Sequence, residues 1–153
     1  MSTQAQDLTI RKSVTVDCSP EHAFDTFTVR LANWWPLDTH SVGGMGGERP
    51  WHAVLEPGVG GRLYELMADG DEHEWAKVLA WEPPNRFVMD WHVNPDNPST
   101  EVEVTFTQDG EGTRVELVHR GWERYGDRAS EAYGDYGTGW EKILGRFAEA
   151  ASG

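Results

Sequence analysis

Hydrophobic and polar residues alternate along most of the chain after residue 50. In segment 101–107, for example, Val102, Val104 and Phe106 are separated by glutamate and threonine side chains. A period of two indicates a β-strand with one buried face and one solvated face. The pattern predicts an early strand over 8–17 and six later strands over 51–56, 62–67, 74–81, 86–93, 101–107 and 113–120.

The segments between the later strands have the composition of tight turns. Segment 83–85 is Pro-Pro-Asn, segment 94–98 is Asn-Pro-Asp-Asn-Pro, and segment 109–112 is Asp-Gly-Glu-Gly. Short connections of this kind join antiparallel neighbours. Lys12 falls on the apolar side of the first strand, which predicts a sheet edge or a bulge there. The run 78–81 is apolar on both sides, which also predicts a bulge.

Helical signals follow the first strand. Ser19 can act as an N-cap, and Pro20 suits the first helical position. Apolar residues then repeat at helical spacing. A second short helix is expected over 31–35, where a proline ends it. Segment 36–50 contains four glycines and has no hydrophobic period, so we expect a loop that is either a mobile lid or a plain connection.

A long amphipathic helix is predicted over 133–151. Its apolar stripe consists of Tyr136, Trp140, Ile143, Leu144, Phe147 and Ala151. The dry face of the sheet is the only large apolar partner for this stripe. The predicted fold class is therefore α+β: a helix-grip fold with a curved antiparallel sheet of six to seven strands wrapped around the long C-terminal helix, and two short helices after the first strand. Space is expected near the open end.

Composition and charge narrow the functions. The 153 residues fit a single domain over 1–153, and the net charge is −13. This charge repels phosphate backbones and anionic lipids, so we expect neither nucleic acid nor membrane as a partner. Cys18 is the only cysteine and no signal sequence is visible, which favours a cytoplasmic protein. No zinc, dinucleotide or nucleophile-elbow motif occurs, so we expect no metal and no cofactor.

Tryptophan is frequent, with eight residues in the chain. Each indole supplies a large apolar surface and one N–H donor, so these residues either fill the core or line an aromatic pocket. We expect side chains from the short helices, the central strands and the last helix to stack on a flat ligand. The candidate ligand-binding residues are Trp34, Trp35, His40, Trp75, Trp81, Met89, Trp91, Phe106, His119, Trp122, Tyr136 and Trp140.

Three further polar positions have both a chemical and a structural interpretation. His119, on the inward side of the last strand, is either a ligand-binding or acid–base residue, or a buried histidine that bonds to the backbone or a carboxylate. We prefer the structural interpretation. Glu65 and Asp90 lie on central strands, and the sequence leaves open whether each faces solvent or the cavity. Desolvation raises the pKa of a carboxyl group, so one that faces the cavity would be a general acid or base.

Several motifs occur together in a recognisable order. They are 19–25 (SPEHAFD), 33–36 (NWWP), 56–57 (EP) with 60–62 (GGR), 77–91 (KVLAWEPPNRFVMDW), 117–122 (LVHRGW) and 139–140 (GW). Together they resemble the START-like, or SRPBCC, superfamily and, within it, the AHSA1-like branch named after activators of the Hsp90 ATPase. The resemblance spans nearly the whole chain.

The resemblance implies a cavity for hydrophobic or aromatic small molecules or, in some relatives, a protein-binding surface, and the family name suggests a stress response. The co-chaperones that named the branch carry a further N-terminal Hsp90-binding domain with no counterpart in these residues, so Hsp90 activation is not expected.

Three functional hypotheses follow. The leading one is binding of a hydrophobic or aromatic small molecule between the C-terminal helix and the sheet, without catalysis. The second is a protein-interaction or chaperone-assisting module, and a homodimer is compatible with either. The third is a cyclase- or hydratase-type enzyme that uses His119 and a carboxylate, because the fold also hosts enzymes.

Overall fold

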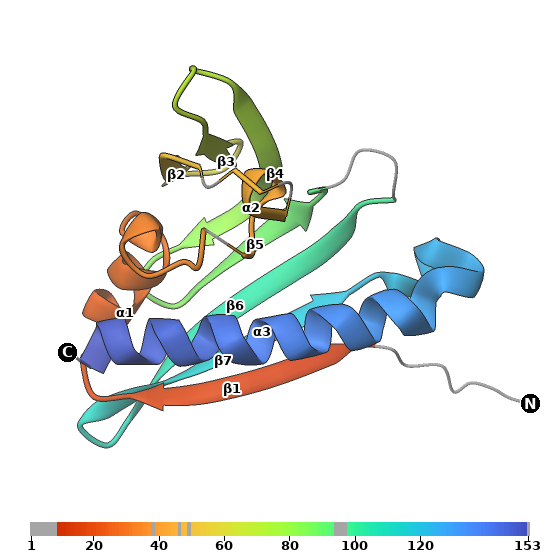
Figure 1. The fold of residues 1–153 in the computed structure, drawn as a ribbon. Helices are drawn as coiled ribbons and strands as arrows, with labels where there is room; N and C mark the ends of the chain where they lie inside the picture. The colour runs from red at the N-terminus through yellow and green to blue at the C-terminus, as the bar shows by residue number, and fades with distance from the viewer. Residues whose placement is uncertain (1–8, 38, 46, 49, 94–97, 153) are drawn as a thin grey trace, which may run out of the picture.

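The computed structural model describes residues 9–37, 39–45, 47–48, 50–93 and 98–152, and it confirms the predicted α+β class. Seven strands form one antiparallel sheet in the order β1-β7-β6-β5-β4-β3-β2, which curves around the C-terminal helix (Figure 1). The strands are β1 (Ile10–Val16), β2 (His52–Leu55), β3 (Arg62–Leu66), β4 (Glu72–Glu82), β5 (Arg86–Trp91), β6 (Thr100–Asp109) and β7 (Gly112–Arg120). Of the predicted strand and turn segments, Leu8 and residues 94–97 lie outside the described residues.

Alternation along the strands sorts side chains between the two faces of the sheet as predicted. In β6, Val102, Val104 and Phe106 are buried on the side of the helix. In β7, Leu117 and His119 are buried on the same side. This inner face provides the apolar surface that the C-terminal helix covers.

The two predicted irregularities have identifiable positions. Strand β1 is an edge strand, and the Lys12 ammonium reaches the Glu141 carboxylate at 2.8 Å. The pairing of β4 with β5 shifts register between Val78 and Ala80, which leaves Leu79 as the extra residue of a bulge. Leu79 is 50% exposed, so the bulge turns one apolar side chain outward.

Three short helical segments follow β1. Helix α1 (Pro20–Phe27) begins as predicted, with Ser19 Oγ accepting a hydrogen bond from the His22 N–H at 3.2 Å. A 3₁₀ turn, η1 (Leu31–Asn33), takes the place of the second predicted helix. The prediction of a loop over 36–50 was wrong in part, because α2 (Val42–Met45) forms one helical turn there.

Tertiary contacts explain why α2 forms despite its glycines. The Gly43 N–H donates to Glu65 Oε2 at 2.7 Å, and the Gly44 N–H donates to Ser41 Oγ at 2.8 Å. These bonds satisfy donors at the start of the turn. Intrinsic propensity, which disfavours glycine by about 1 kcal/mol, is therefore overridden by contacts that the local sequence does not reveal.

The C-terminal helix, α3 (Ala129–Ser152), begins four residues before the predicted start at Tyr133. A 3₁₀ segment that we did not predict, η2 (Trp122–Arg128), leads into it. Gly121 has φ +98° and turns the chain from β7 into η2, a conformation that favours glycine. Trp122 and Ala129 are buried, so their packing holds η2 and the start of α3 in place.

The two halves of α3 have different surroundings. In its C-terminal half, the Phe147 ring lies 4.8 Å from the Phe27 ring and 5.4 Å from the Trp34 ring, centroid to centroid. Figure 1 shows this end of α3 beside α1. The interior here is filled by packed aromatic side chains, so the space that we expected under the helix lies along its N-terminal half.

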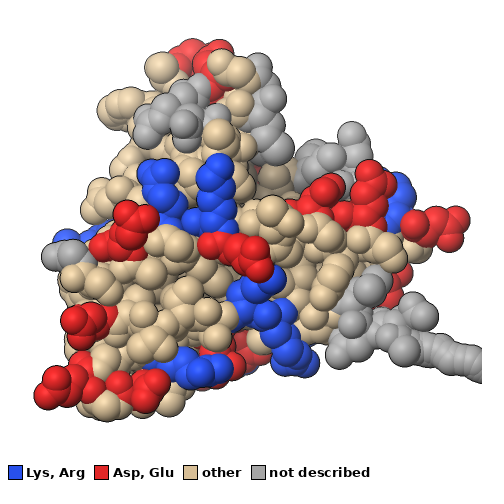
Figure 2. Space-filling view, turned by 60° about the horizontal axis from the view of Figure 1, so that its bottom comes forward, with Lys and Arg blue, Asp and Glu red and all other residues tan. Residues whose placement is uncertain are grey.

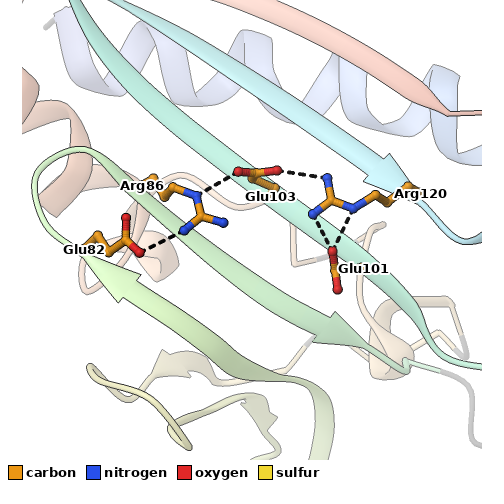
Figure 3. A network of polar contacts seen from close by, with 5 residues as sticks. All are labelled: Glu82, Arg86, Glu101, Glu103 and Arg120. Carbon is orange, nitrogen blue, oxygen red and sulfur yellow. Dashed lines mark hydrogen bonds and ion pairs between the residues drawn. The ribbon is translucent and has the colours of Figure 1, made fainter.

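The outer face of the sheet carries a chain of ion pairs that joins β4, β5, β6 and β7 (Figure 3). Glu103 is central: its carboxylate accepts from Arg86 Nε at 2.8 Å and from Arg120 Nη1 at 2.9 Å. Arg86 also pairs with Glu82, and Arg120 pairs with Glu101. The hydrogen bond from Arg86, followed by that from Arg120, holds the pKa of Glu103 below its usual value.

The charged surface is mixed in sign. On the face drawn in Figure 2, acidic and basic side chains are interspersed, although the chain as a whole has a net charge of −13. No helix in the described part of the chain is long and apolar enough to cross a bilayer.

We expect Glu103→Gln to lower the free energy of unfolding by about 1 kcal/mol at pH 7, since the substitution breaks two charge-assisted hydrogen bonds. Because the folded pKa of Glu103 is depressed, this contribution is present above the ordinary glutamate pKa and is lost as the pH falls through the folded value. Urea denaturation at several pH values measures both effects.

Glu116→Gln is the matched control for Glu103→Gln. Glu116 also points outward, from β7, but its ion pair with Arg114 spans 3.4 Å and both side chains are 50% exposed. A loss for Glu116→Gln as large as that for Glu103→Gln would show that the network carries no special stability.

Candidate functional site

A pocket of about 370 Å³ lies between the N-terminal half of α3 and the sheet. Three walls surround it. Helix α3 contributes Asp135, Tyr136, Gly139, Trp140 and Ile143. The sheet side contributes Trp75, Trp91 and Val93, and the segment between η1 and α2 contributes Trp35, Thr39, His40 and Ser41.

Four indoles form a closed circuit of ring contacts in these walls. Centroid distances are 5.3 Å for Trp35–Trp75, 6.5 Å for Trp75–Trp91, 5.5 Å for Trp91–Trp140 and 5.9 Å for Trp140–Trp35. The rings come from β4, β5, α3 and the segment after η1. Their tilted and edge-to-face arrangement is typical of stable aromatic pairs. Because the rings pack against one another, each of the four residues is only 1–5% exposed and borders the pocket with a small part of its surface.

The protein itself uses the N–H group of each of these indoles. The Trp35 N–H donates to the His40 carbonyl at 2.7 Å, and the Trp91 N–H reaches the Tyr136 hydroxyl oxygen at 3.3 Å. The other two indoles bond to the buried polar residues described below. A molecule in the pocket therefore contacts the rings of the indoles rather than their hydrogen-bond donors.

Tyr136 places a hydroxyl group at this aromatic surface. Its oxygen accepts from the Trp91 N–H, and no described residue accepts the proton of the hydroxyl. Desolvation by burial raises the pKa of Tyr136 above its usual value, so the phenol stays protonated at neutral pH. Tyr136 thus supplies a hydrogen-bond donor to the pocket.

The segment 39–41 forms the polar wall. His40 Nδ1 and Thr39 Oγ1 lie 2.7 Å apart, and Ser41 Oγ donates to the Leu37 carbonyl at 2.6 Å. A Cβ atom built on Gly139 would lie 3.7 Å from the His40 ring, so the absence of a side chain at Gly139 lets this wall approach α3 closely.

Glu65 faces the interior, which resolves one of the two open carboxylate orientations. Its side chain is fully buried, and Oε1 accepts from the Trp75 N–H at 2.6 Å. Oε2 accepts from the Gly43 N–H and lies 3.0 Å from His73 Nδ1. One carboxylate therefore joins the sheet wall of the pocket to α2.

Asp90 faces the opposite side of the sheet. It alternates with the buried Met89 and Trp91, and its carboxylate lies 3.1 Å from His92 Nδ1 on the outer face. His92 Nε2 in turn lies 2.6 Å from Glu74 Oε2. Asp90 is therefore a surface residue and does not reach the pocket.

His119 is completely buried behind the pocket wall. Its Nδ1 accepts from the Trp140 N–H at 3.0 Å, and its Nε2 lies 2.7 Å from Thr100 Oγ1. Since Nδ1 is an acceptor, Nε2 carries the proton of a neutral imidazole and donates to Thr100. Desolvation lowers the pKa of His119 to about 3. His119 is buried, as the structural interpretation has it, but the imidazole bonds to the Trp140 indole and the Thr100 hydroxyl rather than to the backbone or a carboxylate, and it orients Trp140.

Half of the predicted ligand-binding residues line the pocket. The structure brings together Trp35, His40, Trp75, Trp91, Tyr136 and Trp140. Their role in binding stays a prediction.

The other six predicted residues lie elsewhere, for physical reasons. Trp34 and Phe106 belong to the aromatic packing around Phe27, Met89 is enclosed in the core, and Trp81 lies against Phe24 at 5.1 Å. The His119 and Trp122 rings lie 4.3 Å apart, centroid to centroid, in a tilted arrangement behind the pocket wall. Periodicity identifies the inward side of each element but not the position along it.

Six lining residues were missed: Thr39, Ser41, Val93, Asp135, Gly139 and Ile143. A signal existed for four of them. Asp135, Gly139 and Ile143 are spaced by four residues and so share a helix face next to Tyr136 and Trp140. Val93 ends the predicted strand 86–93 on the same side as Met89 and Trp91. Thr39 and Ser41 lie in the predicted loop, where no periodic pattern marks them.

The pocket surface combines indole rings with a phenol, hydroxyl groups and an imidazole. In the described part of the chain, no group of three or more His, Cys, Asp or Glu side chains could hold a metal ion.

Comparison with known proteins identifies the family. The sequence model of the family "Activator of Hsp90 ATPase homolog 1-like protein" matches residues 17–152. The chain belongs to the AHSA1-like family. This result confirms the resemblance seen in the sequence motifs. No curated protein matches the sequence.

Solved structures similar to this AHSA1-like protein have different described roles. An anthrahydroquino-γ-pyrone synthase, Txn09, complexed with SUM, is 37% identical over 92% of this chain and 95% of its own, with a TM-score of 0.61. The self-sacrificing resistance protein CalC from Micromonospora echinospora is 28% identical over 95% and 94%, with a TM-score of 0.66. The Aha1 dimer from Colwellia psychrerythraea is 17% identical over 94% and 96%, with a TM-score of 0.60, and shares the fold.

We expect the stability of this AHSA1-like protein to depend on pH through His119. The pKa of His119 is about 3 in the folded state, against an ordinary value of about 6.5, so between these values the unfolded chain binds a proton that the folded protein does not. Stability should therefore fall as the pH drops below about 6.5, with a contribution of up to about 1.4 kcal/mol per pH unit.

The substitution His119→Gln tests this dependence, because an amide can accept from Trp140 and donate to Thr100 without titrating. Free energies of unfolding measured between pH 5 and 8 should converge for the two proteins as the pH falls. Parallel curves would contradict the assignment of a buried neutral imidazole.

Proposed function

We propose that this protein binds a flat aromatic small molecule that carries an oxygen acceptor, in the pocket between α3 and the sheet. The observation that carries the proposal is the cluster of Trp35, Trp75, Trp91 and Trp140 in the pocket wall, with the Tyr136 hydroxyl beside it. Aromatic rings pack well against an aromatic wall, and the phenol donates a hydrogen bond to a carbonyl or phenol oxygen.

The size of the pocket agrees with this ligand class. Its volume of about 370 Å³ is near the lower end of the range of roughly 300–1,000 Å³ that is typical of small-molecule sites. A compound of two or three fused rings fits such a volume. Dense aromatic packing around Phe27 and Phe147 leaves less room towards the C-terminal end of α3, which favours a compact ligand.

The relatives support an aromatic ligand but not one shared activity. The name of Txn09 denotes an aromatic, oxygen-containing compound, and at 37% identity that protein is informative about ligand class. CalC, at 28% identity, is described as a resistance protein. From these relatives we extend to this protein only the binding of a ligand in the pocket.

A second candidate is catalysis on the bound ligand, which the name of Txn09 as a synthase favours. Tyr136 and His40 are the residues to test in this role, because both line the pocket and both can transfer protons. Incubation of ligand with protein, followed by mass spectrometry, distinguishes catalysis from binding: a ligand of unchanged mass means that the protein binds it without a reaction. A protein-binding role and a homodimer stay predictions of the family resemblance.

Filling the pocket should abolish binding. Gly139→Leu places a side chain between α3 and His40, so we expect loss of binding of 9-fluorenone, measured by quenching of tryptophan fluorescence. Gly145→Leu is the matched control: it lies on the same helix, is exposed, and a Cβ there would meet nothing within 4 Å. Equal affinities for the two variants would argue against this pocket.

The hydroxyl of Tyr136 should distinguish two ligands of the same shape. 9-Fluorenone has a carbonyl oxygen, and fluorene lacks it. Since a neutral hydrogen bond contributes about 1 kcal/mol, Tyr136→Phe should weaken fluorenone binding by about fivefold and leave fluorene binding unchanged. The measurement is again a fluorescence titration, and an equal loss for both ligands would mean that the variant only disturbs packing.

A further inference from the structure

The charge distribution around the pocket is one-sided. Asp135 is exposed at the rim and lines the pocket, and no described residue forms an ion pair or a hydrogen bond with its carboxylate. Among the described lining residues, none is lysine or arginine. The chain also carries a net charge of −13. An anionic ligand would meet no cationic partner in these walls.

The aromatic surface has the same preference for positive charge. The face of an indole carries negative potential, and tryptophan is the best partner for a cation positioned over a ring. In this pocket the N–H groups of all four indoles bond to protein acceptors, so their positive edges are already occupied. Because the four residues are only 1–5% exposed, a ligand meets the small part of each indole that borders the pocket, and cation–π attraction there is strengthened where water is excluded.

We propose that the ligand of this pocket is cationic: an aromatic molecule that carries a protonated amine or a quaternary ammonium group. The charged group lies near Asp135, and the rings of the ligand lie against the parts of the indoles that border the pocket. This inference rests on the proposed function and adds the charge of the ligand to it. Because cation–π attraction and the Asp135 carboxylate act together, a positive charge should increase affinity over that of a neutral molecule of the same shape.

Three probes of nearly the same shape test the charge preference: the cation 1-methylquinolinium, the neutral 1-methylnaphthalene and the anion 1-naphthoate. Equilibrium dialysis at pH 8 and 0.15 M NaCl measures the affinity of all three probes. At this pH an ordinary imidazole is uncharged, and at this ionic strength long-range electrostatic attraction is screened. We expect the cation to bind about tenfold more tightly than the neutral probe, and the anion to bind least.

A pair of charge-matched variants localises the effect. Asp135→Asn should weaken binding of 1-methylquinolinium by about threefold and leave 1-methylnaphthalene unchanged. Glu149→Gln removes one negative charge from an exposed position 14 residues further along α3, where no described residue pairs with the carboxylate, and should change the binding of neither probe. An equal loss in the two variants would attribute the preference to the acidic surface as a whole and overturn the proposal.

The outcomes separate this proposal from the one on which it rests. If the cation and the neutral probe bind equally and Gly139→Leu abolishes binding of both, the charge preference is overturned and the pocket remains a site for aromatic ligands. If no probe shows binding that Gly139→Leu removes, the pocket function fails and the charge preference fails with it.

Discussion

Every indole buried beneath α3 carries an N–H group that must find an acceptor inside the protein. A buried donor without a partner costs about 1–3 kcal/mol, which is a large part of the net stability of a small domain. Trp140 meets this requirement through His119, and Trp75 meets it through Glu65. Each of these polar residues would be costly to bury alone. The aromatic packing and the buried polar residues therefore depend on each other.

This mutual dependence determines the shape of the pocket. Glu65 bonds to Trp75 with one oxygen and to the Gly43 N–H with the other, so it fixes the sheet wall and the short helix α2 together. His119 must stay neutral to accept from Trp140, since a protonated imidazole has no acceptor. Interactions that lie outside the lining thus set the positions of two of the four rings.

The sequence predicted the sheet well because strand periodicity is a local property. The alternation in β6 and β7, the edge position of Lys12 and the bulge at Leu79 all follow from short-range patterns. It did not predict α2, which depends on a bond to Glu65 some twenty residues away, or the early start of α3, which depends on packing of Trp122 and Ala129.

The site was predicted less completely, for a related reason. The inward direction of Trp75, Trp91 and Trp140 could be read from periodicity, but the separation of lining residues from core residues depends on where along α3 the packing stops. Trp34 and Trp140 were both predicted to bind the ligand, but Trp34 packs against Phe147 and Trp140 lines the pocket.

The division of α3 into two ends has a consequence for how such a protein can change. The aromatic side chains that hold the C-terminal end contact α1 and the sheet, so substitutions there put the whole fold at risk. The N-terminal end borders the pocket and carries glycines at 134, 137 and 139, where an added Cβ would meet nothing within 4 Å at the first two positions and only the His40 ring, at 3.7 Å, at the third. Selection can therefore alter ligand preference at one end of the helix while the other end keeps the architecture intact, a separation that lets relatives with one scaffold acquire unrelated biological roles.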